Sequence, residues 1–162
     1  MITKSDKRLI MLVHIGIGAL LLYAAWTKLG EIPMFALVLK RGVPGMGGLS
    51  TPQLFHLANA VVFVEVFIGL ALILHLRPAL TRWAAVALFA VFSGVLASML
   101  VREVPMSCGC LGLSPSGWSG HGEHAFGLAR NAFLIALLFV VDRHAKNTMS
   151  SPGESREPAP AV

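Results

Sequence analysis

The sequence has little charge, and this shortage excludes a water-soluble globule. Only 13% of its 162 residues are charged, whereas 56% are hydrophobic. A soluble domain usually has about 25% charged residues, and a chain this short cannot bury so much apolar surface because most of a small protein is surface. We therefore predict one membrane domain in contact with the lipid bilayer. The 13 basic against 8 acidic residues bear on membrane orientation, and we expect no nucleic-acid partner.

The sequence instead contains long apolar runs. Four of them are long enough to cross the ~30 Å hydrocarbon core as helices, namely residues 9–29, 57–76, 83–101 and 125–141. They predict an all-α fold, a four-helix transmembrane bundle within residues 1–145, followed by a disordered cytoplasmic tail at 146–162 that is rich in Pro, Ser and Glu. The first run is longer than a signal peptide needs and no cleavage site follows it, so we expect it to be retained.

The basic residues of the loops predict that both termini lie in the cytoplasm. With the N-terminus inside, the outer loops contain three basic residues, Lys40, Arg41 and Arg102. The cytoplasmic side then holds eight: Lys4, Lys7, Arg8, Arg77, Arg82, Arg143, Lys146 and Arg156. This arrangement obeys the positive-inside rule, and we expect a multi-pass protein of the bacterial inner membrane. The two long loops, residues 30–56 and 102–124, face outward.

The first outer loop is rich in glycine and proline and is predicted to be mostly irregular. Its first part, residues 31–40, is apolar enough for a short interfacial helix. Pro33 would stand in the first turn of that helix, where proline is tolerated.

Cysteine is scarce, and both cysteines lie in the second outer loop as Cys108-Gly109-Cys110. Two cysteines this close can form a disulfide, and Gly109 supplies the backbone freedom for so small a ring. A bridge over one residue restrains almost no loop, whereas strained, exposed disulfides exchange readily. The pattern favours thiol–disulfide exchange in an oxidising compartment, with Cys108 and Cys110 as candidate catalytic residues.

Two other interpretations of the cysteines stay open. Cys108, Cys110, His121 and His124 form a C-x-C-x10-H-x2-H pattern, a complete ligand set for tetrahedral zinc or for copper. Both spacings are tighter than those of most zinc sites. Alternatively, the two thiols are structural.

Three charged residues fall within the predicted spans, on the outer side. These are Lys28, Glu65 and Arg130, with Glu65 deepest at ~12 Å. Because a charge at that depth is costly, we expect a Glu65–Lys28 or Glu65–Arg130 contact, which Asn131 would join. The cluster is either a structural ion pair or the lining of a pocket for a headgroup, which in a thiol-oxidising membrane protein would be a quinone.

Two histidines lie at similar depths near the inner side. His14 and His75 would suit a haem, but they stand in helices of opposite direction. Capping or interhelical hydrogen bonding explains them better.

Four segments carry a family resemblance. They are YAAWTKL in the first span, VEVFIGLAL around Glu65, SCGCLG after the third span and GLARNAFLIALL in the fourth. The most specific element is Cys108-Gly109-Cys110, followed about twenty residues later by Arg130-Asn131. With these segments the sequence resembles the MauE (methylamine utilisation) branch of the DoxX-like integral membrane proteins. Leu111 stands where other members more often have phenylalanine.

The resemblance implies a four-helix membrane protein that assists disulfide formation or maturation of a periplasmic partner. Cys108 and Cys110 would exchange with a thioredoxin-like or disulfide-rich protein. The cofactor pocket, for a quinone, would be shaped by Lys28, Glu65, Arg130 and Asn131. The alternative is a non-catalytic accessory subunit of a larger respiratory or photosynthetic membrane complex, with Cys108 and Cys110 structural or bound to zinc or copper.

Overall fold

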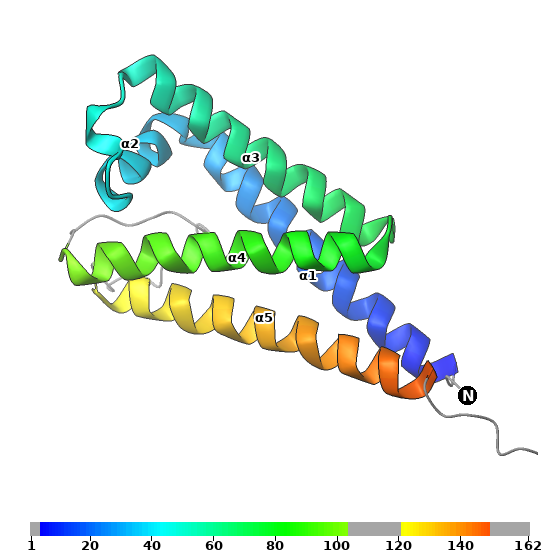
Figure 1. Cartoon of the computed structure of the whole chain (residues 1–162). Helices are drawn as coiled ribbons and strands as arrows, with labels where there is room; N and C mark the ends of the chain where they lie inside the picture. Colours follow the sequence, from blue (N-terminus) through cyan, green and yellow to red (C-terminus); the bar gives the residue numbers. More distant parts are fainter. Residues whose placement is uncertain (1–3, 104–120, 150–162) are drawn as a thin grey trace, which may run out of the picture.

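The computed structural model describes residues 4–103 and 121–149, and this part of the chain is helical with short turns. Its elements are α1 (Lys4–Gly30), α2 (Ile32–Gly42), the 3-10 turn η1 (Met46–Gly48), α3 (Thr51–Ile73), α4 (Pro78–Val101) and α5 (His121–Met149) (Figure 1). Four helices, α1, α3, α4 and α5, are long and apolar enough to cross a membrane. The predicted all-α fold with four spans is confirmed.

The spanning helices form two antiparallel pairs. α1 packs mainly against α3, and α4 packs mainly against α5. Figure 1 shows the pairs crossing at an angle, with α2 at the end where they are furthest apart. The start of α1 and the end of α5 lie together at the opposite end, so α2, the end of α4 and the start of α5 share one side of the bundle.

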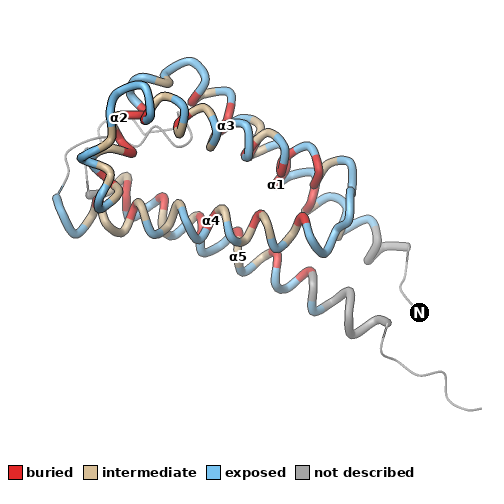
Figure 2. Tube along the Cα trace, turned by 45° about the horizontal axis from the view of Figure 1, so that its top comes forward, coloured by how far each residue is buried: buried red, intermediate tan, exposed pale blue. Residues whose placement is uncertain are grey.

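Apolar side chains fill the interior, and others face outward along the full length of the bundle. Figure 2 shows buried positions on the inward sides of the helices and exposed positions on the outward sides. Trp26, Phe63 and Phe67 are 74%, 72% and 73% exposed. Large apolar side chains at such exposure suit contact with lipid tails. The central core draws on all four spans: Ile17, Leu21, Ile68, Leu72, Ala85, Phe89, Leu134 and Leu138.

The α1–α3 pair is joined at the level of the backbone. A Cβ added at Gly18 would lie 2.7 Å from the carbonyl oxygen of Gly69, and one added at Gly69 would lie 3.0 Å from the carbonyl oxygen of Gly18. Small residues let membrane helices approach this closely. The two glycines therefore fix how α1 and α3 cross.

The short helix predicted at residues 31–40 is present as α2, with Pro33 in its first turn. Phe35, Ala36 and Leu39 are buried on one face of α2, which packs against α3 and α4. Ser98 of α4 donates its hydroxyl hydrogen to the carbonyl oxygen of Gly42 at the end of α2. α2 is thus a packed part of the bundle rather than a separate surface helix.

All four spanning helices begin four to six residues earlier than the apolar runs indicate, and the earlier starts of α3 and α5 bear on the site. α3 begins at Thr51, because the backbone N–H of Ser50 donates to Oε1 of Gln53 at 2.9 Å and caps the first turn. α5 begins at His121, so His124, predicted to lie in a loop, is helical and buried. The irregular part of the first outer loop is correspondingly short.

Candidate functional site

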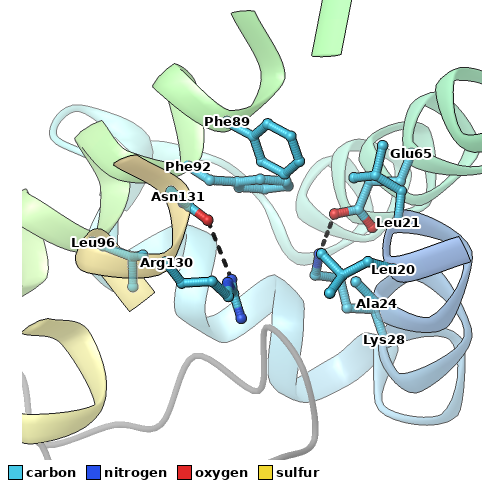
Figure 3. A pocket seen from close by; sticks show the side chains of 10 residues that line it. All are labelled: Leu20, Leu21, Ala24, Lys28, Glu65, Phe89, Phe92, Leu96, Arg130 and Asn131. Atoms are coloured by element: carbon cyan, nitrogen blue, oxygen red, sulfur yellow. Dashed lines mark hydrogen bonds and ion pairs between the residues drawn. The ribbon is translucent and has the colours of Figure 1, made fainter. Parts of the chain in front are cut away.

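A small, mostly apolar pocket with polar side chains on two of its walls lies between the two helix pairs, and all four spanning helices contribute to it. Figure 3 shows Lys28 and Glu65 on one side and Arg130 and Asn131 on the other, with two phenylalanines of α4 between them. The cavity volume is about 20 Å³, enough for one or two water molecules. Its lining residues are Leu20, Leu21, Ala24, Lys28, Glu65, Phe89, Phe92, Leu96, Arg130 and Asn131.

A buried ion pair forms one wall of this pocket. The ammonium of Lys28 donates to Oε1 of Glu65, and the two residues are 3% and 0% exposed. Of the two contacts that the sequence left open, the structure has Glu65–Lys28. Each charge would be costly at this depth alone, and the pairing offsets the cost of removing both from water.

The position of Glu65 along its helix differs from the sequence-based expectation. α3 begins at Thr51 rather than near residue 57, so Glu65 lies about 21 Å along the helix instead of ~12 Å. Lys28 still reaches it, although it stands in the last turn of α1. The first turns of α3 extend past the end of α1 at Gly30 and pack against α2. The last turn of α1 therefore lies level with the middle of α3, where Glu65 stands.

Aromatic rings surround the ammonium of Lys28. Its Nζ lies 4.5 Å from the ring centroid of Phe92 on α4 and 5.3 Å from that of Phe35 on α2. Both distances are within the range of a cation–π interaction, which is strongest where water is excluded. Oε2 of Glu65 has no hydrogen-bond partner in the described part of the chain. That oxygen is a buried acceptor available to another group.

The opposite wall is formed by α5. Nη2 of Arg130 donates to Oδ1 of Asn131 at 3.3 Å, and Nδ2 of Asn131 donates to the hydroxyl oxygen of Ser93 at 3.4 Å. Asn131 is 1% exposed. Asn131 therefore lines the same pocket, but it bonds Arg130 and Ser93 instead of joining the Glu65–Lys28 pair as expected.

Sequence reasoning missed the contribution of α4. The third span contains no charged residue between Trp83 and Val101, so hydropathy marked it as a plain membrane helix. Ser93 was a usable signal, because a hydroxyl inside an apolar span requires a hydrogen-bond partner. It also donates to the carbonyl oxygen of Phe89 at 2.8 Å. Phe92 gave no signal, since its role comes from the neighbouring ammonium.

The predicted catalytic residues Cys108 and Cys110 lie outside the described residues, and so does the side chain of His121. His124 is 1% exposed near the start of α5. Within residues 4–103 and 121–149, no group of three or more His, Cys, Asp or Glu side chains is placed to hold a metal ion. The Cys108, Cys110, His121 and His124 zinc or copper site therefore stays a prediction.

A family model described as methylamine utilisation protein MauE matches residues 6–141. The chain belongs to the MauE family. The match includes every residue that lines the pocket and extends from α1 into α5. This membership and the four apolar helices make the chain a multi-pass membrane protein. No curated protein and no solved structure matches the chain.

The pocket of this MauE family member fits a quinone in chemistry but not in size. Lys28, Arg130 and Asn131 offer hydrogen-bond donors of the kind that a quinone oxygen accepts. Ligand pockets usually measure ~300–1,000 Å³, whereas this cavity measures about 20 Å³. A quinone ring requires the helices around the cavity to move apart, while a water molecule fits as the helices stand.

Proposed function

We propose that the protein is a membrane thiol–disulfide redox protein. In its oxidised form, Cys108 and Cys110 are bridged. A thiolate of a disulfide-rich or thioredoxin-like partner attacks one sulfur and forms a mixed disulfide, and a second thiolate of the partner resolves it. The partner gains a disulfide, and Cys108 and Cys110 are left as a dithiol. Turnover then requires a two-electron oxidant, for which a membrane quinone is the proposed class.

The position of the buried cluster supports this proposal most directly. The segment with both cysteines connects the end of α4 to the start of α5. Leu96 stands about 8 Å before the end of α4, and Arg130 stands about 14 Å after the start of α5. The pocket therefore lies beneath the two helix ends that bracket the cysteines. A buried polar cluster there is unexpected for a helix bundle with no chemistry, because intramembrane charges are expensive.

Glu65 is the residue we assign to proton transfer. Oxidation of the dithiol releases two electrons and two protons, and the quinone takes up both as it becomes a quinol, so a group that passes the protons on is needed where water is scarce. Oε1 of Glu65 is held by Lys28, while Oε2 has no hydrogen-bond partner among the described residues. A carboxylate held in position with one oxygen available is suited to general-base work.

The proposed orientation places the cysteines outside the cytoplasm. The distribution of basic residues, eight against three, favours cytoplasmic termini. The α2 end of the bundle and the α4–α5 connection would then face the periplasm of a bacterial inner membrane, where disulfides persist. Labelling of single cysteines with a membrane-impermeant maleimide in intact cells tests this orientation.

The decisive experiment measures thiol oxidation by mass spectrometry after alkylation under non-reducing conditions. We expect Cys108 and Cys110 to be bridged in the isolated membrane protein and to open with mild reductant. Reoxidation of the reduced pair by a soluble quinone should slow about 100-fold in Glu65→Gln. The exposed Glu31→Gln at the same end of the bundle is the matched control and should reoxidise at the normal rate.

Two results would contradict the proposal in different ways. If Glu65→Gln reoxidises as fast as Glu31→Gln, the cluster is only structural. If Cys108 and Cys110 stay reduced and resist alkylation in the folded protein, exchange is excluded. That second result would favour the accessory subunit of a larger membrane complex.

A further inference from the structure

A second buried polar feature lies at the other end of α1 and α3, away from the charged pocket. His14 of α1 is 3% exposed, and its ring centroid lies 5.3 Å from that of His75, with the ring planes tilted by 59°. His75 follows the end of α3, in the turn that leads to α4, and its side chain is exposed. The two rings therefore meet where the interior of the bundle reaches its surface.

Hydrogen bonding fixes which nitrogen of His14 is available. Nδ1 of His14 lies 2.8 Å from the carbonyl oxygen of Ile10. A carbonyl oxygen only accepts, so Nδ1 carries the hydrogen and Nε2 of the neutral ring presents a lone pair. Nε2 is buried and has no hydrogen-bond partner within the described residues. A buried polar atom left in this state points to a missing water molecule or ion.

His75 has the same arrangement. Its Nδ1 lies 3.3 Å from the carbonyl oxygen of Ile73, so its Nε2 also presents a lone pair. Metal-binding histidines typically donate the other ring N–H to a backbone carbonyl in this way, which sets the tautomer and the direction of the ring. Both rings thus have the tautomer of a metal ligand, and no carboxylate is needed to set it.

The backbone that holds His75 is strained. His75 and Arg77 have φ values of 53° and 43°, in the left-handed region that residues with a Cβ rarely adopt. Three hydrogen bonds hold this turn. The N–H of His75 donates to the carbonyl oxygen of Leu72 at 3.3 Å, and that of Leu76 donates to the carbonyl oxygen of Ala71 at 3.0 Å. Thr81 donates its hydroxyl hydrogen to the carbonyl oxygen of Leu76. Strain of this kind persists where the surroundings enforce it and is common at ligand sites.

We propose that His14 and His75 bind one transition-metal ion through their Nε2 atoms. Imidazole nitrogen suits copper and zinc. An ion about 2.1 Å from each Nε2 in a tetrahedral arrangement would set the two ring centroids about 5.2 Å apart, which agrees with the 5.3 Å observed. With two protein ligands, the remaining positions of the ion face the exposed side of His75.

The surrounding charge favours a singly charged ion. Two neutral imidazoles bring no negative charge to the ion, and no third His, Cys, Asp or Glu joins the pair in the described part of the chain. Without a carboxylate or thiolate to offset it, the cost of removing a divalent ion from water is larger than that for a monovalent ion. The site therefore binds Cu(I) more tightly than Zn²⁺.

The test uses the full-length Cys108→Ser/Cys110→Ser protein in lipid nanodiscs, because the thiols themselves bind these metals. Cu(I) is supplied without oxygen and competed against a chromophoric Cu(I) chelator, and Zn²⁺ is titrated in parallel. We expect one Cu(I) per chain and weaker Zn²⁺ binding. His14→Ala and His75→Ala should each lose the Cu(I), while His56→Ala, which removes an exposed histidine of α3, should retain it.

His75→Ala keeps the test valid if His14→Ala does not fold, since the His75 side chain is exposed. X-ray absorption of the copper-loaded starting protein should show two imidazole ligands. Copper retained equally by His14→Ala and His75→Ala would overturn the proposal. The proposal would also be overturned if the starting protein bound no more copper or zinc than His75→Ala does. In that case the partner of Nε2 in His14 is a water molecule.

Discussion

The interface between α1 and α3 differs in kind from the interface between α4 and α5. In the first, Gly18 and Gly69 approach each other's backbone, and Lys28 pairs with Glu65. In the second, a Cβ at Gly127 would meet only the side chain of Leu96, and the hydrogen bond from Asn131 to Ser93 beside the pocket is long, at 3.4 Å. The pocket therefore lies between a rigid half and an adaptable half. If a ligand enlarges the pocket, we expect α4 and α5 to move.

The largest effect should come from removing one member of the buried ion pair. Lys28→Met leaves Glu65 charged and 0% exposed without its partner. We expect a loss of about 3–5 kcal/mol in the free energy of unfolding, since a lone buried charge is costly. Unfolding by SDS in mixed micelles measures the loss.

A double substitution separates the charge effect from the effect of shape. Lys28→Met/Glu65→Leu replaces both charges by apolar groups and should recover most of the lost stability, because such replacements are often neutral or stabilising. The double variant should fold and yet fail to reoxidise the cysteines if Glu65 accepts their protons. A Lys28→Met protein as stable as the parent would show that the ion pair does not hold α1 against α3.

The next largest effect concerns the close approach of α1 to α3. A Cβ at Gly18 would lie 2.7 Å from a backbone oxygen of Gly69, so Gly18→Ala must push the helices apart. We expect a loss of about 1–3 kcal/mol, as for other overpacked sites. Gly16→Ala is the matched control on the same helix, because a Cβ there meets nothing within 4 Å. Equal stability of the two variants would mean that the α1–α3 interface is not rigid.

The number of spanning helices was predictable because hydropathy is a property of the sequence alone. Four apolar runs whose charges lie at their ends or are paired inside can be solvated only by lipid. The ends of the helices were less predictable, because they depend on polar residues, and a hydropathy profile assigns polar residues to loops. Ser50 and Gln53 form a capping pair that the sequence shows as S-x-x-Q. Applying that pattern would have placed the start of α3 correctly.

The site was predictable in composition but not in pairing. Depth along each helix placed Lys28, Glu65 and Arg130 in the outer half of the membrane, but depth does not say which way a side chain points around its helix. The Glu65–Lys28 pair follows from the crossing of α1 and α3, which is set by Gly18 and Gly69. Contacts between helices far apart in the chain require packing that no single segment encodes.

A smaller effect is expected from filling space between α4 and α5. A Cβ at Gly127 would lie 2.9 Å from Cδ1 of Leu96, the far end of a flexible side chain. Because Leu96 can rotate away, Gly127→Ala should cost about 1 kcal/mol or less, with Gly94→Ala as the control at a site without near neighbours. A loss as large as that of Gly18→Ala would remove the distinction between the two interfaces.

The smallest effect should come from the hydrogen bond between Asn131 and Ser93. A double-mutant cycle with Ser93→Ala and Asn131→Leu measures their coupling, which we expect to be about 0.6 kcal/mol, typical of hydrogen bonds between membrane helices. The length of this bond, 3.4 Å, is consistent with weak coupling. A coupling above about 2 kcal/mol, beyond what such bonds reach, would mean that α5 is fixed to α4 as firmly as α1 is to α3. The movement that admits a ligand would then have to lie between the two pairs rather than within the second one.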